Sequence, residues 1–181
     1  KPFYISHYGR HGSRYHTLEK YFAESYLTLE KARLAGNLTA GGECLLKQTD
    51  SLYRLHDGML GVLTPKGARE QKALARRMCE RFPEVFAGKG VKRIEGYSSD
   101  IPRCIVSMAA FTGTVLSQYP GIDVSYESGE RCSRYLRITD TYAPSKEYYY
   151  PLMHEAIEKS CDWSSVMEKL FVDPSLAEIS P

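Results

Sequence analysis

Predicted strands and helices alternate along most of this chain, which limits the folds that it can adopt. The predicted strands are residues 3–8, 91–98, 122–126 and 135–138. A helical pattern over 100–119, with Asp100 as its expected cap, separates the second strand from the third. Strands separated by helices are typical of a parallel sheet in an α/β fold. We therefore predict one α/β domain over residues 1–181.

Residues 17–60 interrupt this alternation, because they contain two successive segments whose apolar residues have helical spacing and no strand between them. The predicted helices are residues 17–35, 42–56, 64–82, 100–119, 146–159 and 163–171. Thr64 and Pro65 fit the N-cap and the first position of the third helix. No linker divides the chain, so we interpret residues 17–60 as a helical insertion within the single domain.

Charge and hydropathy exclude two classes of partner. The 181 residues include 24 Lys and Arg against 22 Asp and Glu, a net charge of +2. This balance leaves no broad basic field for nucleic acid, and the basic residues near 76–77 and 89–93 have acidic neighbours. No apolar run reaches the length of a membrane span. We expect neither a nucleic-acid partner nor a membrane-spanning segment.

The five cysteines have neither CxxC spacing nor paired histidines. A zinc site is therefore not indicated, and buried, inert thiols are the favoured interpretation. One disulfide bond remains an alternative if the protein is exported.

The peptide from Gly9 to Thr17 combines two arginines and a histidine around a glycine, directly after the first predicted strand. Gly12 allows the backbone to pass close to a ligand, so Arg10, His11 and Arg14 can converge on one point. Guanidinium groups form bidentate hydrogen bonds with phosphoryl oxygens. A single histidine at a strand end is usually structural, but this clustering favours a phosphate site.

His11 fits the role of a nucleophile on phosphorus. Neighbouring positive charge favours the neutral imidazole, which leaves one ring nitrogen with a free lone pair. The arginines would stabilise the charge of the transition state on the phosphoryl oxygens. The expected product is a phosphohistidine that water then hydrolyses.

The Arg-His-Gly-Ser-Arg peptide at 10–14 resembles the signature of the histidine acid phosphatases, the second branch of the histidine phosphatase superfamily. The likeness extends to residues 63–67 and 97–104 and is strongest to the inositol polyphosphate phosphatases and phytases of that branch. It implies an incomplete three-layer, phosphoglycerate-mutase-like fold with a parallel sheet. It also implies that Arg103 is a third phosphate ligand, that Thr17 contacts substrate, and that no metal or cofactor is needed.

Two departures from that family pattern are visible. His16 stands where the branch usually has proline, two residues after the second arginine of the signature. The second active-site histidine and its acidic proton donor are not found; His154-Glu155-Ala156 has the required residue types in the wrong order. Because the family chain is roughly twice as long and this one begins with Lys1, we expect the N-terminal part of a longer enzyme.

The residues and the resemblance together predict a phosphomonoesterase that acts on inositol polyphosphates such as inositol hexakisphosphate (phytate). Two alternatives remain open: a catalytically incomplete phosphate-binding fragment or accessory subunit, and a phosphotransferase similar to phosphoglycerate mutase. The expected partners are the phosphorylated small molecule and the missing C-terminal part. The resemblance implies a periplasmic, cell-surface or secreted location.

Overall fold

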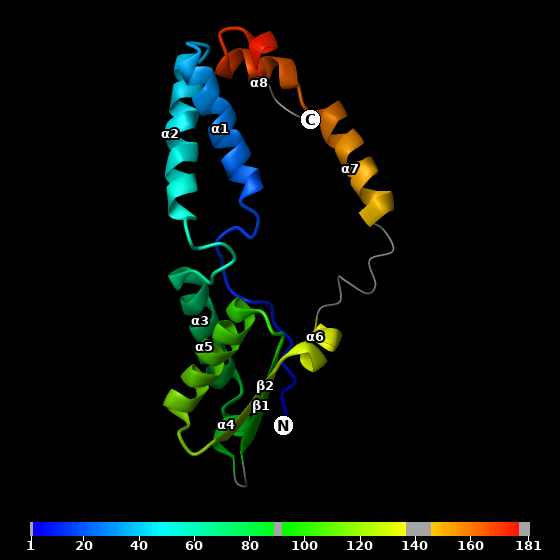
Figure 1. Ribbon diagram of the computed structural model, residues 1–181. Coiled ribbons are helices and arrows are strands. Elements are labelled where there is room, and N and C mark those ends of the chain that lie inside the picture. Colours follow the sequence, from blue (N-terminus) through cyan, green and yellow to red (C-terminus); the bar gives the residue numbers. More distant parts are fainter. Residues whose placement is uncertain (1, 89–91, 137–145, 178–181) are drawn as a thin grey trace. The chain divides into compact units, whose positions relative to one another are not determined.

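The computed structural model describes residues 2–88, 92–136 and 146–177 and has a mixed α/β structure that is mostly helical (Figure 1). Its elements are α1 (Lys20–Leu34), α2 (Ala40–Leu55), α3 (Pro65–Arg81), α4 (Pro83–Ala87), β1 (Arg93–Ser98), α5 (Pro102–Gln118), β2 (Asp123–Ser128), α6 (Glu130–Leu136), α7 (Lys146–Ser160), α8 (Trp163–Leu170) and the 3-10 helix η2 (Pro174–Leu176). Residue contacts divide the chain into a first unit, Lys1–Tyr15 with Gly61–Tyr142, and a second unit, His16–Leu60 with Ala143–Pro181. The single-domain assignment stays a prediction.

The first unit contains a β-α-β arrangement. β1 and β2 pair in parallel, in a register from Arg93 opposite Asp123 to Ser98 opposite Ser128, and α5 connects them. This pairing confirms the predicted parallel sheet for these two strands. The buried core of the unit consists of Ala75, Cys79, Val115 and Ile122. These side chains come from α3, α5 and the turn before β2, so they fix both helices against the sheet.

The prediction of a buried strand at 3–8 is wrong. In the described structure these residues have no strand partner, and the exposed fractions of Phe3 and Tyr4 are 92% and 72%. A strand is stable only where its backbone is paired and one face is covered, and neither condition is met here. Side-chain contacts hold the segment instead: His7 stacks on Phe111 at 4.9 Å, and the Tyr8 hydroxyl donates to the carbonyl of Leu136.

The predicted strand at 135–138 is also wrong where the structure describes it. Tyr135 and Leu136 form the last turn of α6, and residues 137–138 lie outside the described residues. The helix begins after Gly129, whose φ of 144° favours glycine, and the N–H of Ser133 donates to the Gly129 carbonyl at 2.9 Å. Local helical hydrogen bonding therefore replaces strand pairing at this point.

The predicted helices are confirmed, with shifted ends. α1 begins at Lys20 rather than 17, and α2 begins at Ala40 after an N-cap at Thr39. Thr64 caps α3 as predicted, by accepting a hydrogen bond from the N–H of Gly67. The cap expected at Asp100 is wrong, because α5 begins after Ile101 and the Asp100 carboxylate accepts from the Ser133 hydroxyl at 2.7 Å.

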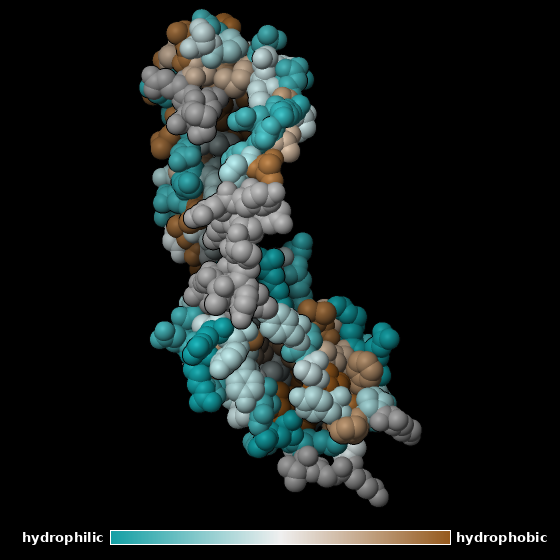
Figure 2. Space-filling model, turned by 90° about the vertical axis from the view of Figure 1, so that its right-hand side faces the viewer, coloured by the Kyte–Doolittle hydropathy of each residue, from teal (hydrophilic) through white to brown (hydrophobic). Residues whose placement is uncertain are grey.

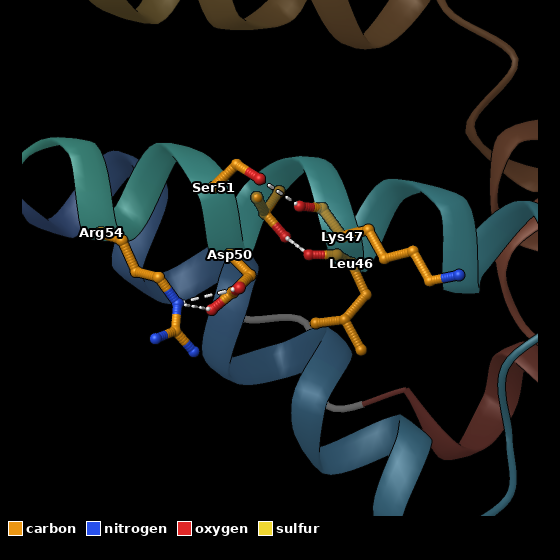
Figure 3. Close-up of polar contacts among 6 residues, drawn as sticks. Leu46, Lys47, Asp50, Ser51 and Arg54 are labelled. Carbon is orange, nitrogen blue, oxygen red and sulfur yellow. Dashed lines mark hydrogen bonds and ion pairs between the residues drawn. The ribbon is translucent and has the colours of Figure 1, made fainter.

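The second unit is built on the α1–α2 pair, against which α8 and the following residues pack. Its buried core consists of Leu29, Ala32, Leu46 and Phe171. Leu46 points from α2 toward α1, while Asp50 and Arg54 form an ion pair along α2 (Figure 3). The side chain of Asn37 accepts a hydrogen bond from the N–H of Asp173 at 2.7 Å and donates one to its carbonyl at 2.9 Å. These contacts join the loop after α1 to the chain after α8.

The cysteines divide by exposure. Cys79 and Cys132 are buried, and burial raises the pKa of both thiols, as expected for inert cysteines. Cys44 and Cys161 are exposed, so the expectation of burial is wrong for them. Cys104 is half-buried, and all five thiols are free.

Hydrophobic residues reach the surface in the lower half of Figure 2, where they appear as brown areas. The exposed large aromatic and aliphatic side chains of the first unit include Phe3, Tyr4, Tyr8, Val106, Tyr126 and Tyr135. In the residues that the structure describes, no helix combines the length and the apolar character that crossing a membrane requires.

Candidate functional site

A cavity of about 760 Å³ lies between the 10–14 loop and one face of α3. Its lining residues are Arg10, His11, Gly12, Ser13 and Arg14 from the loop, and Glu70, Gln71, Ala73, Leu74 and Arg77 from α3. Every lining residue belongs to the first unit. The arginine and histidine side chains singled out at 10–14 in the sequence therefore share one cavity.

The loop approaches α3 closely because glycines face each other at the contact. A Cβ atom on Gly12 would overlap the backbone of Gly67, and a Cβ on Gly67 would overlap the carbonyl of Ser13. The N–H of Gly12 donates to the Ser107 hydroxyl of α5 at 3.2 Å. Only residues without side chains fit here, so the loop rests on backbone in a defined position.

Hydrogen bonds to the start of α3 fix the loop further. The Ser13 carbonyl accepts from both the N–H and the hydroxyl of Thr64, each at 2.9 Å. The backbones of Arg14 and Leu63 form an isolated antiparallel β-bridge. The N–H of Tyr15 donates to the carbonyl of Val62 at 2.9 Å. Thr64 therefore caps α3 and anchors the loop with one side chain.

His11 has one ring nitrogen engaged and one available. Its Nδ1 lies 2.8 Å from the carbonyl oxygen of Gly12, which can only accept, so Nδ1 is the protonated nitrogen. Burial, opposed by this hydrogen bond but assisted by the charges of Arg103, Arg10 and Arg14, lowers the pKa of His11. The neutral imidazole is therefore favoured, with its lone pair on Nε2.

Three arginines place positive charge at His11. Burial and the charges of Arg103 and Arg10 also lower the pKa of Arg14, although a guanidinium stays protonated at any ordinary pH. The Arg14 and Arg103 guanidiniums donate to the carbonyls of Tyr15 at 2.9 Å and Gly61 at 3.4 Å. Within the described ranges, none of the three forms an ion pair with a carboxylate.

Arg103 differs from the other two arginines in its surroundings. Its Nε is buried without a hydrogen-bond partner in the described structure, and its side chain does not line the cavity although its charge acts on His11. A buried donor without a partner is costly unless a ligand satisfies it. The positive charge of Arg103 favours an anion beside His11.

Thr17, the remaining predicted site residue, and His154 belong to the second unit. Thr17 belongs to the second unit, so its contact with substrate stays a prediction. His154 lies on α7 of the second unit and is exposed. The structure thus brings together His11, Arg10, Arg14 and, through its charge, Arg103.

Sequence reasoning missed the residues that support the loop. Glu70, Gln71 and Ser107 all bond to it, and the amide of Gln71 donates to the carbonyl of Arg10 at 3.0 Å. They are separated from their partners by 57, 61 and 95 positions, so no local pattern identifies them. In the part of the chain that the structure describes, no group of three or more His, Cys, Asp or Glu side chains could hold a metal ion.

Comparison with known proteins shows a partial similarity. No family model matches the chain. Over 105 residues, the chain is 33% identical to multiple inositol polyphosphate phosphatase 1 of Gallus gallus. The matched part covers 56% of this chain and 21% of that protein, so the chain spans about a fifth of the length of this relative. The similarity supports a histidine-phosphatase-like relationship.

Proposed function

We propose that this protein hydrolyses phosphate monoesters of inositol polyphosphates, phytate among them, through a phosphohistidine at His11. The observation that supports this most strongly is the charge arrangement at His11. A half-buried imidazole with a free Nε2 is surrounded by three arginines, none paired with a carboxylate in the described structure. Such a site is complementary to a phosphoryl group and to the negative charge that its transfer develops.

In the first step, Nε2 of His11 attacks the phosphorus atom. The P–N bond forms as the bond from phosphorus to the ester oxygen breaks, and the leaving oxygen takes a proton from a general acid. Arg10 and Arg14, which line the cavity, hold the phosphoryl oxygens, and the charge of Arg103 adds to the stabilisation of the negative charge on them. In the second step, the deprotonated acid takes a proton from water as the water oxygen attacks phosphorus. The P–N bond breaks, phosphate leaves, and both His11 and the acid are restored.

The general acid belongs to a part of the protein other than the described cavity. Glu70 is the one carboxylate among the described lining residues, and two hydrogen bonds from Ser13 lower its pKa. An ionised carboxylate has no proton to give, so Glu70 does not fit the role. We propose that the acid lies in a C-terminal part, as the resemblance to histidine acid phosphatases implies, and that this part completes a three-layer phosphoglycerate-mutase-like domain with 17–60 as its insertion.

We also propose that the protein is exported, because the resemblance to histidine acid phosphatases points to a periplasmic, cell-surface or secreted location. Fractionation of cells followed by detection of the protein tests this assignment.

The direct test of the activity is phosphate release from inositol hexakisphosphate by the wild type, His11→Ala and His154→Ala. We expect the wild type to release phosphate and His11→Ala to release none. His154→Ala, which removes an exposed histidine of the second unit, is expected to release phosphate at the wild-type rate. Binding of inorganic phosphate without any release would instead support a phosphate-binding fragment or accessory subunit. Transfer of phosphate to a second alcohol in preference to water would support the mutase-like phosphotransferase.

A further inference from the structure

Glu70 and Ser13 form a contact that the proposed chemistry does not use. The N–H of Ser13 donates to Oε2 of Glu70 at 2.8 Å, and the Ser13 hydroxyl lies 2.8 Å and 2.9 Å from the two carboxylate oxygens. Because the Ser13 carbonyl is bound by Thr64, every polar group of Ser13 is bonded to α3 or its cap. Among the described residues of the 10–14 loop, no other has all of its polar groups bonded to α3 or its cap.

Ser13 lies between the two functional parts of the loop. His11 precedes it by two residues and Arg14 follows it directly, so the orientation of the 12–13 and 13–14 peptides sets where both side chains project. The Gly12 carbonyl that fixes the His11 tautomer belongs to the first of these peptides. A rotation at Ser13 would move the acceptor of Nδ1 and the guanidinium together.

The contact also keeps a carboxylate away from the arginines. Glu70 lines the same cavity as Arg10 and Arg14, yet in the described structure it forms no ion pair with either. Both of its oxygens accept from Ser13 instead. The arginines therefore stay available for an anion although an acidic side chain is close by.

We propose that Glu70 is a positioning residue, which holds Ser13 and through it orients the His11 imidazole and the Arg14 guanidinium for phosphoryl transfer. The proposal rests on the proposed function, because it assigns how that same site is held in place. Glutamine at this position preserves the contact: its oxygen can accept from the Ser13 N–H while its amide donates to the hydroxyl. Alanine removes the contact altogether.

The test compares Glu70→Ala, Glu70→Gln and Ser13→Ala with Glu80→Ala, which removes an exposed glutamate from the same helix. We expect Glu70→Ala to lower kcat on the order of a hundredfold with a small change in KM, because misplacement of reacting groups acts mainly on the transition state. Glu70→Gln retains most of the turnover, Ser13→Ala is intermediate, and Glu80→Ala matches the wild type. Wild-type kcat in Glu70→Ala, or equal losses in Glu70→Ala and Glu80→Ala, overturns the proposal.

A second measurement does not depend on turnover, and Ser13→Ala and Glu70→Gln keep it informative if Glu70→Ala fails to fold. The nitrogen chemical shifts of His11 report which ring nitrogen is protonated, and inorganic phosphate is the probe for the arginines. In Glu70→Ala and in Ser13→Ala we expect a weaker preference for the Nδ1-protonated tautomer of His11 and weaker binding of inorganic phosphate. In Glu70→Gln we expect the tautomer preference and the phosphate affinity of the wild type. If the wild type releases no phosphate, the proposed function fails, while unchanged shifts and affinity in both variants refute the role of Glu70.

Discussion

The protonation of His11 links the site's electrostatics to a measurable pH dependence. Burial and the charges of Arg103, Arg10 and Arg14 lower its pKa, so the imidazole stays neutral at lower pH than an ordinary histidine does. As the pH falls through this lowered pKa, Nε2 gains a proton and loses its lone pair. We expect the acid-side fall of kcat/KM to occur at a pH below the one at which a free histidine titrates.

Removal of one of those charges changes the pKa in a known direction. In Arg103→Ala the loss of positive charge raises the pKa of His11, and the acid limb of the pH profile moves to higher pH. Titration of the His11 ring protons by NMR measures the change. Arg131→Ala, which removes an exposed arginine of α6, is the matched control. An unchanged or lower pKa of His11 in Arg103→Ala contradicts the described charge arrangement.

At the scale of elements, the glycine contact between the loop and α3 is predicted to limit substitution. In Gly12→Ala the new methyl group would overlap the backbone of Gly67, and the expected loss of stability is about 1–3 kcal/mol, as for overpacked sites. Gly113→Ala is the control, because a Cβ there meets no atom within 4 Å and the helical position favours alanine by about 0.5–1 kcal/mol. Urea denaturation of both variants gives the comparison. Equal stabilities would show that the loop does not rest on α3 as described.

The Thr64 hydroxyl joins the same two elements by a different contact. Thr64→Ala removes the cap of α3 and one hydrogen bond to Ser13, for an expected loss of about 1–2 kcal/mol, while Thr64→Ser keeps both contacts. Thermal unfolding followed by circular dichroism measures the difference. A Thr64→Ser variant as unstable as Thr64→Ala would indicate that the methyl group, not the hydroxyl, stabilises this junction.

Elements were predictable from the sequence where their signals are local. Thr64-Pro65 and Pro83 bracket α3, and the helical pattern after Pro102 marks α5. Asp100 shows the limit of local signals, because its carboxylate bonds to Ser133, 33 residues away, instead of capping the next helix. The strand expected at 3–8 failed for a similar reason, since apolar residues indicate a strand only when a partner strand exists.

The site was predictable to the same degree. Arg10, His11 and Arg14 are adjacent in the sequence, so their chemistry could be read from one peptide. Arg103 followed only from the resemblance and from its place at the start of a helix. Glu70 and Ser107 could not be identified, because their roles depend on which face of α3 and α5 meets the loop.

At the scale of the whole molecule, the two units have separate cores, and the candidate site belongs to the first. Phe171→Ala removes a side chain that is 2% exposed from the second core, with an expected loss of about 3–5 kcal/mol within that unit. We expect faster amide exchange in α1, α2 and α8 and unchanged exchange in α3 and α5. Equal acceleration in both units would contradict the division into two units.

The central claim is that His11 becomes covalently phosphorylated during turnover, and one measurement tests it directly. The protein is mixed with inositol hexakisphosphate, quenched in alkali, where a phosphorus–nitrogen bond survives, and digested for mass spectrometry. We predict one added phosphoryl group on the peptide that contains His11, lost on acid treatment and absent in His11→Ala. Phosphate release without any phosphoryl group on His11, or with the group on another residue, would contradict the account.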